Sequence, residues 1–241
     1  KHWSRGLGDV YKRQARFSLL AILVALLGIA NARDVPRSLD AAVEKFVQKA
    51  GLTDRTPGIA VFVNRSKVLH QSYVGFADLK TGKAIDAYTP FRLASVSKPF
   101  TALCIQQLAE KGVIRYDAPV RNYLPHFPWG TVTIHHLLTH TGGLPEYTSV
   151  DFLKAQPTNQ DVLNAIKSRR LKFKPGSRMR YSNSGYAMLA LVVESVSKRP
   201  FGAYADRFVF KPAKMQSAVV PGIHWQKVPN RAVGYNRVAG R

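Results

Sequence analysis

Ser95 and Lys98 are the residues whose types and spacing could carry chemistry, and they lie in the segment FRLASVSKPFT. Residues three apart lie on one face of a helix. Pro99 lacks an N–H and is tolerated only in a first turn, so we expect a helix to begin near Ser95. The N-terminal field of that helix favours negative charge on Ser95 and disfavours an ammonium ion, so Lys98 could accept the serine proton. The pair could act as nucleophile and base in acyl transfer.

The spacing alone is not specific, because chance supplies about one such serine and lysine pair in a chain of this length. The same tetrapeptide, SVSK, recurs at 195–198, at the end of a helix that we expect to begin near Ser184. The negative end of the helix dipole there favours Lys198 as a charged cap and opposes an alkoxide at Ser195. We interpret the second copy as structural.

A second polar element, Tyr181-Ser182-Asn183, lies in a predicted loop that contains a Pro-Gly turn and precedes a helix. Positive neighbours would favour the phenolate form of Tyr181, which could then shuttle a proton. The amide of Asn183 has a donor and an acceptor, so it could bind a lysine ammonium and a substrate amide together. These residues are candidates for the same site as Ser95.

Three segments occur in the order FRLASVSKPFTAL, LLTHTGGLPEY and RYSNSGYAML. Together they resemble the serine β-lactamase-related family, which groups class C β-lactamases, DD-peptidases and related esterases and amidases. The resemblance runs from about residue 39 to 235. It implies that Ser95 is the acylated nucleophile, that Lys98 and Tyr181 are its proton-transfer partners and that Asn183 contacts substrate. It implies no metal or organic cofactor, and a β-lactam, D-amino-acid peptide or ester as substrate.

Two departures from the family pattern are visible. No Lys/His-Thr/Ser-Gly triplet follows Tyr181, although the family carries one on a core strand that supplies an oxyanion N–H. Residues 211–215 (KPAKM) stand where relatives often have a Pro-Leu-Gly-Met turn. We therefore expect that the chain is truncated at its C-terminus and inactive by itself.

Hydrophobic periodicity predicts an α+β fold of the β-lactamase/transpeptidase type, with a helical region inserted into an antiparallel sheet that is incomplete here. Helices are expected at 39–50, 97–111, 134–138, 161–167, 184–198 and 201–210, and a β-hairpin at 59–63 and 68–74. The expected organisation is an adapter-derived artefact (1–14), a signal peptide (15–32), a first part of the sheet domain (33–92), a helical region with the active site (93–213) and a return to the sheet domain (214–241).

The N-terminal segment predicts export. A 13-residue, largely apolar run at 17–29 is followed by Ala30-Asn31-Ala32, which has the form of a signal-peptidase site. The run is too short to cross a bilayer as a helix. We expect cleavage after Ala32, a periplasmic or secreted protein without a membrane span, and a monomer.

Composition excludes several classes of protein. An apolar content of 46% argues against a disordered chain, and a single cysteine argues against a disulfide scaffold. The net charge is +22, and seven Lys and Arg residues lie at 167–180. No nucleic-acid-binding motif accompanies them, so we expect no nucleic-acid partner and interpret the stretch as a solvated face that meets anionic substrates or polymers.

Other candidate sites are weaker. His136 and His140 have the spacing of a zinc motif, but Leu137 stands where its glutamate would be, so we interpret them as loop or core histidines. Cys104 falls on an apolar helix face and is interpreted as a buried hydrophobic residue. No G-x-S-x-G nucleophile elbow is present, and no Ser-His-Asp triad has local support.

The sequence thus predicts an exported serine hydrolase that forms an acyl-enzyme on Ser95 with an amide, lactam or ester. Two alternatives remain open: a non-catalytic binder of cell-wall peptides on the same fold, and a basic surface protein that binds anionic polymers.

Overall fold

The computed structural model describes residues 38–53, 55–64, 68–147, 157–220 and 228–235. The predicted signal peptide and adapter-like segment lie outside these residues. The described residues form two compact units, one containing the residues up to Thr89 and those from Asn230 onward, the other spanning Pro90–Pro229. Helices together with small antiparallel sheets confirm the α+β class. Among the described residues, no helix combines the length and the apolarity needed to cross a membrane.

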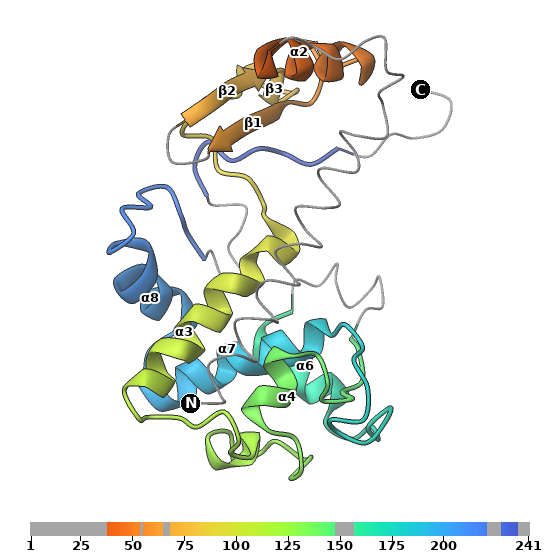
Figure 1. Ribbon diagram of the computed structural model, residues 1–241, viewed down its shortest axis with the longest axis vertical. Helices are drawn as coiled ribbons and strands as arrows, with labels where there is room; N and C mark the ends of the chain where they lie inside the picture. Colours follow the sequence, from red (N-terminus) through yellow and green to blue (C-terminus); the bar gives the residue numbers. More distant parts are fainter. Residues whose placement is uncertain (1–37, 54, 65–67, 148–156, 221–227, 236–241) are drawn as a thin grey trace. The chain divides into compact units, whose positions relative to one another are not determined.

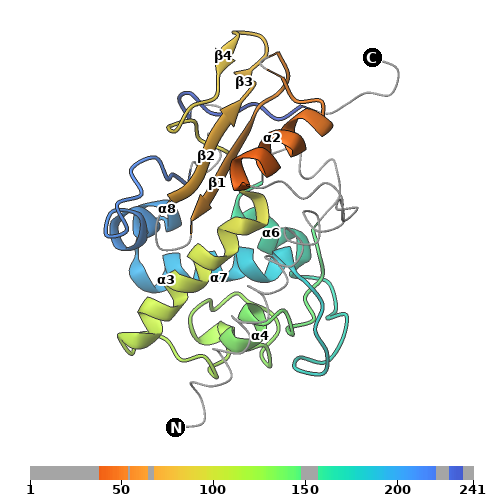
Figure 2. The same ribbon diagram turned by 45° about the horizontal axis from the view of Figure 1, so that its top comes forward.

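The first unit consists of a helix and two antiparallel strand pairs: α2 (Leu39–Lys49), β1 (Ile59–Asn64), β2 (Val68–Val74), β3 (Phe76–Asp78) and β4 (Lys83–Ala84). The Ser38 hydroxyl caps α2 by accepting the Ala41 N–H at 3.2 Å. In the hairpin, Ile59 pairs with Val74. Figures 1 and 2 show α2 beside β1 and β2. The predicted first helix and hairpin are confirmed.

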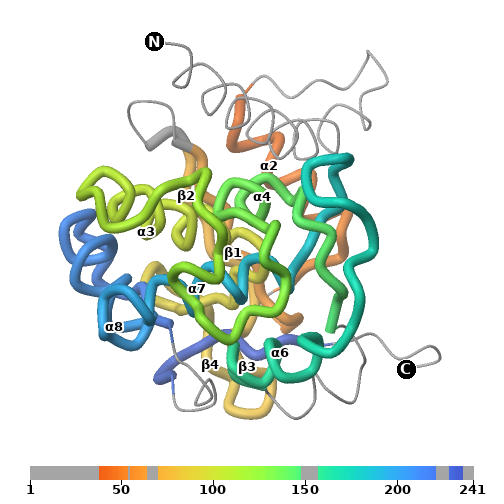
Figure 3. The backbone as a smooth tube through the Cα atoms, turned by 90° about the horizontal axis from the view of Figure 1, so that it is seen from below, coloured from red at the N-terminus to blue at the C-terminus, as the bar shows by residue number. Residues whose placement is uncertain are grey.

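The second unit is helical. Its elements are η1 (Ala94–Ser97), α3 (Lys98–Glu110), η2 (Val120–Asn122), α4 (Ile134–Leu138), α6 (Asn159–Ile166), α7 (Asn183–Ser197), α8 (Phe201–Ala205) and the π-turn η3 (Asp206–Phe210). Figure 3 shows α7 in the middle of this unit, with α3, α4, α6 and α8 around it. Nine residues of α7 are buried, which is why this helix is apolar nearly all round.

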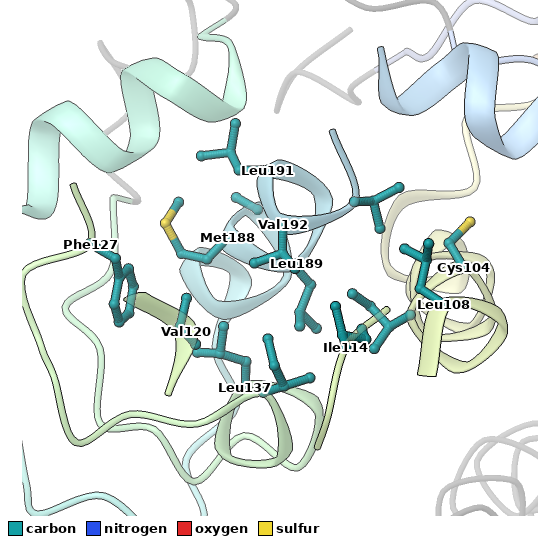
Figure 4. Packing of buried hydrophobic residues seen from close by; sticks show 14 of the residues in the cluster. Cys104, Leu108, Ile114, Val120, Phe127, Leu137, Met188, Leu189, Leu191 and Val192 are labelled. Atoms are coloured by element: carbon teal, nitrogen blue, oxygen red, sulfur yellow. The ribbon is translucent and has the colours of Figure 1, made fainter. Parts of the chain in front are cut away.

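The core of the second unit holds α7 in place. Met188, Leu189 and Val192 of α7 are fully buried. Figure 4 shows them among Leu137 of α4 and Leu108 of α3. Burying each such side chain stabilises the fold by about 1.5–3 kcal/mol. The well-packed core therefore fixes the position of the N-terminal end of α7, which begins at Asn183.

Three local expectations are corrected. Ser95 does not begin the α-helix but lies in the preceding 3₁₀ turn η1, and α3 starts at Lys98 with Pro99 in its first turn. The apolar spacing of Phe100, Leu103, Cys104 and Leu108 predicts a buried helix face that includes Leu103. In the structure Leu103 is 36% exposed, because α3 faces the core with Thr101, Cys104, Ile105 and Leu108 instead. The helix expected at 201–210 is α only to Ala205 and then widens into the π-turn η3.

Candidate active site

Ser95 is presented by a strained turn at the entrance to α3. The turn η1 is closed by the Val96 N–H, which donates to the Leu93 carbonyl at 3.0 Å. Ala94, directly before the serine, has a φ of 47°, a left-handed conformation that costs free energy for a residue with a Cβ. Ser95 itself is exposed. The hydroxyl therefore lies at the surface beside the N-terminus of α3, where the helix field favours negative charge.

Lys98 links the serine to the second predicted motif. Its Nζ donates to Ser95 Oγ at 3.2 Å and to Asn183 Oδ1 at 2.8 Å. The side chain is half-buried. The Lys98 amine therefore lies between Ser95 and Asn183, and Lys98 follows Ser95 by one helical turn, as the sequence predicts.

Tyr181 contacts the same hydroxyl from the other side. Its phenol donates to Ser95 Oγ at 2.6 Å, across 86 positions of sequence. The Lys98 Nζ lies 4.7 Å from the centroid of the Tyr181 ring. Ser95 Oγ thus receives hydrogen bonds from an amine and a phenol, two groups that can exchange its proton and stabilise its alkoxide form.

Asn183 is the first residue of α7 and is half-buried. Its carbonyl oxygen is used by Lys98, which leaves its amide N–H groups as the donors that a substrate carbonyl could meet. The structure therefore brings together all four predicted site residues, Ser95, Lys98, Tyr181 and Asn183, within one compact unit.

His140 is a site component that the sequence reasoning missed. Its side chain is buried, and its ring centroid lies 4.6 Å from that of Tyr181 and 5.1 Å from that of Tyr186. Burial, followed by the positive charge of Lys98, lowers the pKa of His140 to about 4. The imidazole is thus neutral at neutral pH. The sequence predicts a loop or core histidine at this position, although His140 belongs to the segment LLTHTGGLPEY that supports the family resemblance.

Glu146, from the same segment, is a second missed component. Its Oε2 accepts the backbone N–H groups of Asn183 at 3.1 Å and Ser184 at 3.3 Å. The Ser182 hydroxyl accepts the next one, from Gly185, at 2.9 Å. The first N–H groups of α7, which have no partner inside a helix, are therefore satisfied by a carboxylate and a hydroxyl. The only sequence feature that could have pointed to Glu146 is its place in the segment LLTHTGGLPEY, which belongs to the family pattern.

The second SVSK tetrapeptide has different surroundings. The Ser195 hydroxyl donates to the Tyr123 carbonyl at 2.6 Å. Lys198 lies just after α7 with a φ of 55° and caps its C-terminal end through its backbone. Identical residues therefore occupy opposite helix ends, and only the first pair meets Tyr181 and Asn183.

The remaining candidates have other contacts. Cys104 is fully buried, and burial raises the pKa of its thiol to about 11, which keeps it protonated. His136 takes part in a capping box with Thr133 at the start of α4. Among the described residues, no group of three or more His, Cys, Asp or Glu side chains is arranged to hold a metal ion. In the basic stretch, the guanidinium of Arg169 donates to the Glu146 carbonyl and that of Arg178 lies over the Phe173 ring.

The chain belongs to the beta-lactamase family, whose model matches residues 39–222. This membership confirms the resemblance and the β-lactamase/transpeptidase-like fold. The chain is 33% identical over 186 residues to penicillin-binding protein 4* of Bacillus subtilis (strain 168), an alignment that covers 74% of this chain and 41% of that protein. The chain thus spans less than half the length of this relative.

Solved structures show the same fold. The penicillin-binding protein from Bacillus halodurans is 31% identical with a TM-score of 0.72, over 82% of this chain and 62% of that one. EstCE1, described as a hydrolase with promiscuous acyltransferase activity, is 26% identical with a TM-score of 0.69, over 84% of this chain and 58% of that one. The family is of the serine hydrolase type and takes small-molecule or peptide substrates.

Proposed function

We propose that this protein is a serine hydrolase that transfers an acyl group through an ester formed on Ser95 Oγ. One observation carries the proposal: Ser95 Oγ lies within hydrogen-bond distance of both the Lys98 amine and the Tyr181 phenol. An exposed serine with two such partners at a helix N-terminus has what a nucleophile of acyl transfer needs.

The mechanism follows from these contacts. Ser95 Oγ attacks the carbonyl carbon of an amide, lactam or ester while its proton passes to Lys98 as a neutral amine or to Tyr181 as a phenolate. As the tetrahedral intermediate collapses, the carbonyl reforms, the bond to the leaving nitrogen or oxygen breaks, and the proton is delivered to that leaving atom. Water or an amine then attacks the Ser95 ester and gives up a proton to the same base. The bond between the acyl carbon and Ser95 Oγ breaks, the acyl group leaves, and the proton returns to Ser95 Oγ. The Asn183 amide orients the substrate, and its oxygen holds the Lys98 amine beside Ser95.

The substrate proposal stays at the level of an acyl compound: a β-lactam, a D-amino-acid peptide or an ester. The relatives named above are called penicillin-binding proteins or a hydrolase with acyltransferase activity. The alternative of a basic polymer-binding surface is less well supported, because Arg169 and Arg178 of the basic stretch contact the protein itself.

A labelling experiment with paired serine variants tests the proposal. The protein expressed from its complete gene is treated with a fluorescent penicillin and a fluorophosphonate, alongside Ser95→Ala and Ser195→Ala. The second variant removes a serine from the same tetrapeptide, so it is a matched control. Labelling that survives in Ser195→Ala and is lost in Ser95→Ala supports the enzyme. Labelling that persists in Ser95→Ala would mean that another nucleophile reacts and would overturn the proposal. Labelling of no protein at all favours the non-catalytic binder.

Export is a separate proposal, supported by the apolar run at 17–29 and the small residues of Ala30-Asn31-Ala32. We propose that the protein is cleaved after Ala32 and acts outside the cytoplasm. The test is N-terminal sequencing of the mature protein after cell fractionation. A cytoplasmic protein that retains residues 15–32 would exclude it.

A further inference from the structure

His140 lies in a backbone conformation that the surrounding structure must maintain. It follows α4 and the residue Thr139, and its φ is 59°. Left-handed backbone is uncommon for a residue with a side chain and persists where several contacts hold it. His140 is also 3% exposed, so its polar atoms need partners inside the protein.

Those partners lie on both sides of Tyr181. The His140 carbonyl accepts the Arg180 N–H at 2.9 Å, and the His140 Nδ1 accepts the Ser182 N–H at 3.1 Å. A single residue therefore holds the backbone directly before and directly after the tyrosine. The two bonds set the direction in which the Tyr181 side chain leaves the chain.

The His140 ring completes the support. It packs against the Tyr181 ring with the two planes 33° apart, and against the Tyr186 ring at the same angle. The Tyr186 hydroxyl donates to the Leu138 carbonyl at 3.2 Å, which anchors that neighbour to α4. The imidazole therefore occupies the space into which the Tyr181 ring would otherwise turn.

Protonation would remove part of this support. Protonated, Nδ1 could no longer accept the Ser182 N–H. The groups described against the ring are the Lys98 amine, whose positive charge opposes a second one, and the Tyr181 and Tyr186 rings, so no carboxylate described there favours a charged imidazole. The neutral ring is the form that fits.

We infer that His140 is a positioning residue of the acyl-transfer site, which holds the Tyr181 phenol against Ser95 Oγ through two backbone hydrogen bonds and a stacked ring. The inference rests on the proposed function, because it concerns the proton transfer that Tyr181 performs there. It extends that function by assigning a role to a residue that acts through Tyr181.

Two variants separate the ring from the acceptor. His140→Asn tolerates left-handed backbone and keeps an oxygen near the position of Nδ1, but it loses the stacked ring. His140→Phe keeps a ring but leaves the Ser182 N–H without its acceptor. His135→Ala, an exposed histidine of α4, is the control. Urea unfolding of each purified full-length variant establishes that it is folded.

The readout is the rate of Ser95 acylation by a fluorescent penicillin or fluorophosphonate from pH 5 to 9. We expect each His140 variant to lower this rate about 10- to 100-fold and to shift its pH profile, because a misplaced phenol transfers the proton less well. Probe concentration at half-maximal rate should change less than the maximal rate. His135→Ala should behave as the wild type.

A double-mutant cycle distinguishes positioning from a general structural role. In a Tyr181→Phe background the phenol is absent, so replacing His140 should change the acylation rate less than about twofold. A full additional loss in that background, or unchanged rates in both single variants, overturns the inference while the proposed function stands. Failure of the wild type to be labelled at all overturns the proposed function and this inference with it.

Discussion

At the scale of residues, the chemistry depends on one oxygen with two neighbours. Ser95 Oγ is 3.2 Å from the Lys98 amine and 2.6 Å from the Tyr181 oxygen. In the second tetrapeptide, at 195–198, the Ser195 hydroxyl instead donates a hydrogen bond to the Tyr123 backbone carbonyl. Comparison of the two identical tetrapeptides therefore shows that the neighbouring side chains, and not the sequence SVSK itself, distinguish Ser95 from Ser195.

Lys98→Ala is expected to lower the acylation rate of Ser95 about 100- to 10,000-fold, because it removes a proton-transfer group and the partner of Asn183. The rate is measured with a fluorescent penicillin or fluorophosphonate. Lys198→Ala changes the same residue type in the second tetrapeptide and should leave the rate unchanged. Equal losses in the two variants would contradict the assignment of Lys98.

His140 also predicts how stability depends on pH. Its folded pKa of about 4 lies below the ordinary histidine value, so the unfolded chain binds the proton first. The free energy of unfolding should therefore be highest above pH 6.5 and fall as the pH is lowered toward 4, by at most about 1.4 kcal/mol per pH unit from this group.

Urea unfolding at pH 7, 6 and 5 measures this dependence, with His140→Asn as the comparison. The variant should show a shallower fall over the same range. His136, whose pKa is lowered by burial and by His135, titrates in both proteins and cancels in the comparison. Parallel curves for the two proteins would show that His140 is not the group responsible.

At the scale of elements, the site is assembled where two helices begin. α3 starts at Lys98 and α7 at Asn183, and the hydrogen bond between these residues joins the two helix ends. The segment that follows α4 supplies His140 and Glu146, whose side chains accept backbone N–H groups at the start of α7. The predicted ranges 97–111, 134–138 and 184–198 agree with α3, α4 and α7 to within one residue at each end, because hydrophobic periodicity and helix-end signals are local.

Glu146→Gln is expected to lower the free energy of unfolding by about 1 kcal/mol, because the carboxylate at the N-terminus of α7 loses its charge. Acylation should slow as well, since Asn183 begins that helix. Urea unfolding and probe labelling measure the two effects. Glu110→Gln places the same change at the exposed C-terminal end of α3, where losing a negative charge should be neutral or stabilising.

An equal loss of stability in Glu146→Gln and Glu110→Gln would contradict this capping role. It would show that the amide itself is poorly tolerated, whichever end of a helix carries it.

At the scale of the whole molecule, the described residues form two units, and all the site residues lie in the helical one. The chain spans 41% of penicillin-binding protein 4*. The family triplet expected on a core strand is not found after Tyr181 in this sequence.

The chain of residues 33–241 is accordingly expected to show little or no acylation by a fluorescent penicillin, whereas the protein from the complete gene is labelled on Ser95. The physical reason is that residues 182–241 carry no Lys/His-Thr/Ser-Gly triplet of the kind that supplies an oxyanion N–H in the family pattern, and loss of such a donor costs about 100- to 1,000-fold in rate. Circular dichroism of the shorter protein checks that it is folded. Equal labelling of both proteins would show that residues 33–241 suffice.

The sequence by itself determined the local features: helices and a hairpin from periodicity, Pro99 in a first turn, and the candidate residues Ser95, Lys98, Tyr181 and Asn183. That these four residues lie close together was predicted only from the family resemblance. Lys98 and Asn183 are 85 positions apart, and they come together only when the buried face of α7 packs against α3. Tertiary structure alone decided that Ser95 precedes the helix, that Leu103 faces outward and that His140 and Glu146 support the site. Such contacts depend on burial and long-range packing, which no local pattern of residue types encodes.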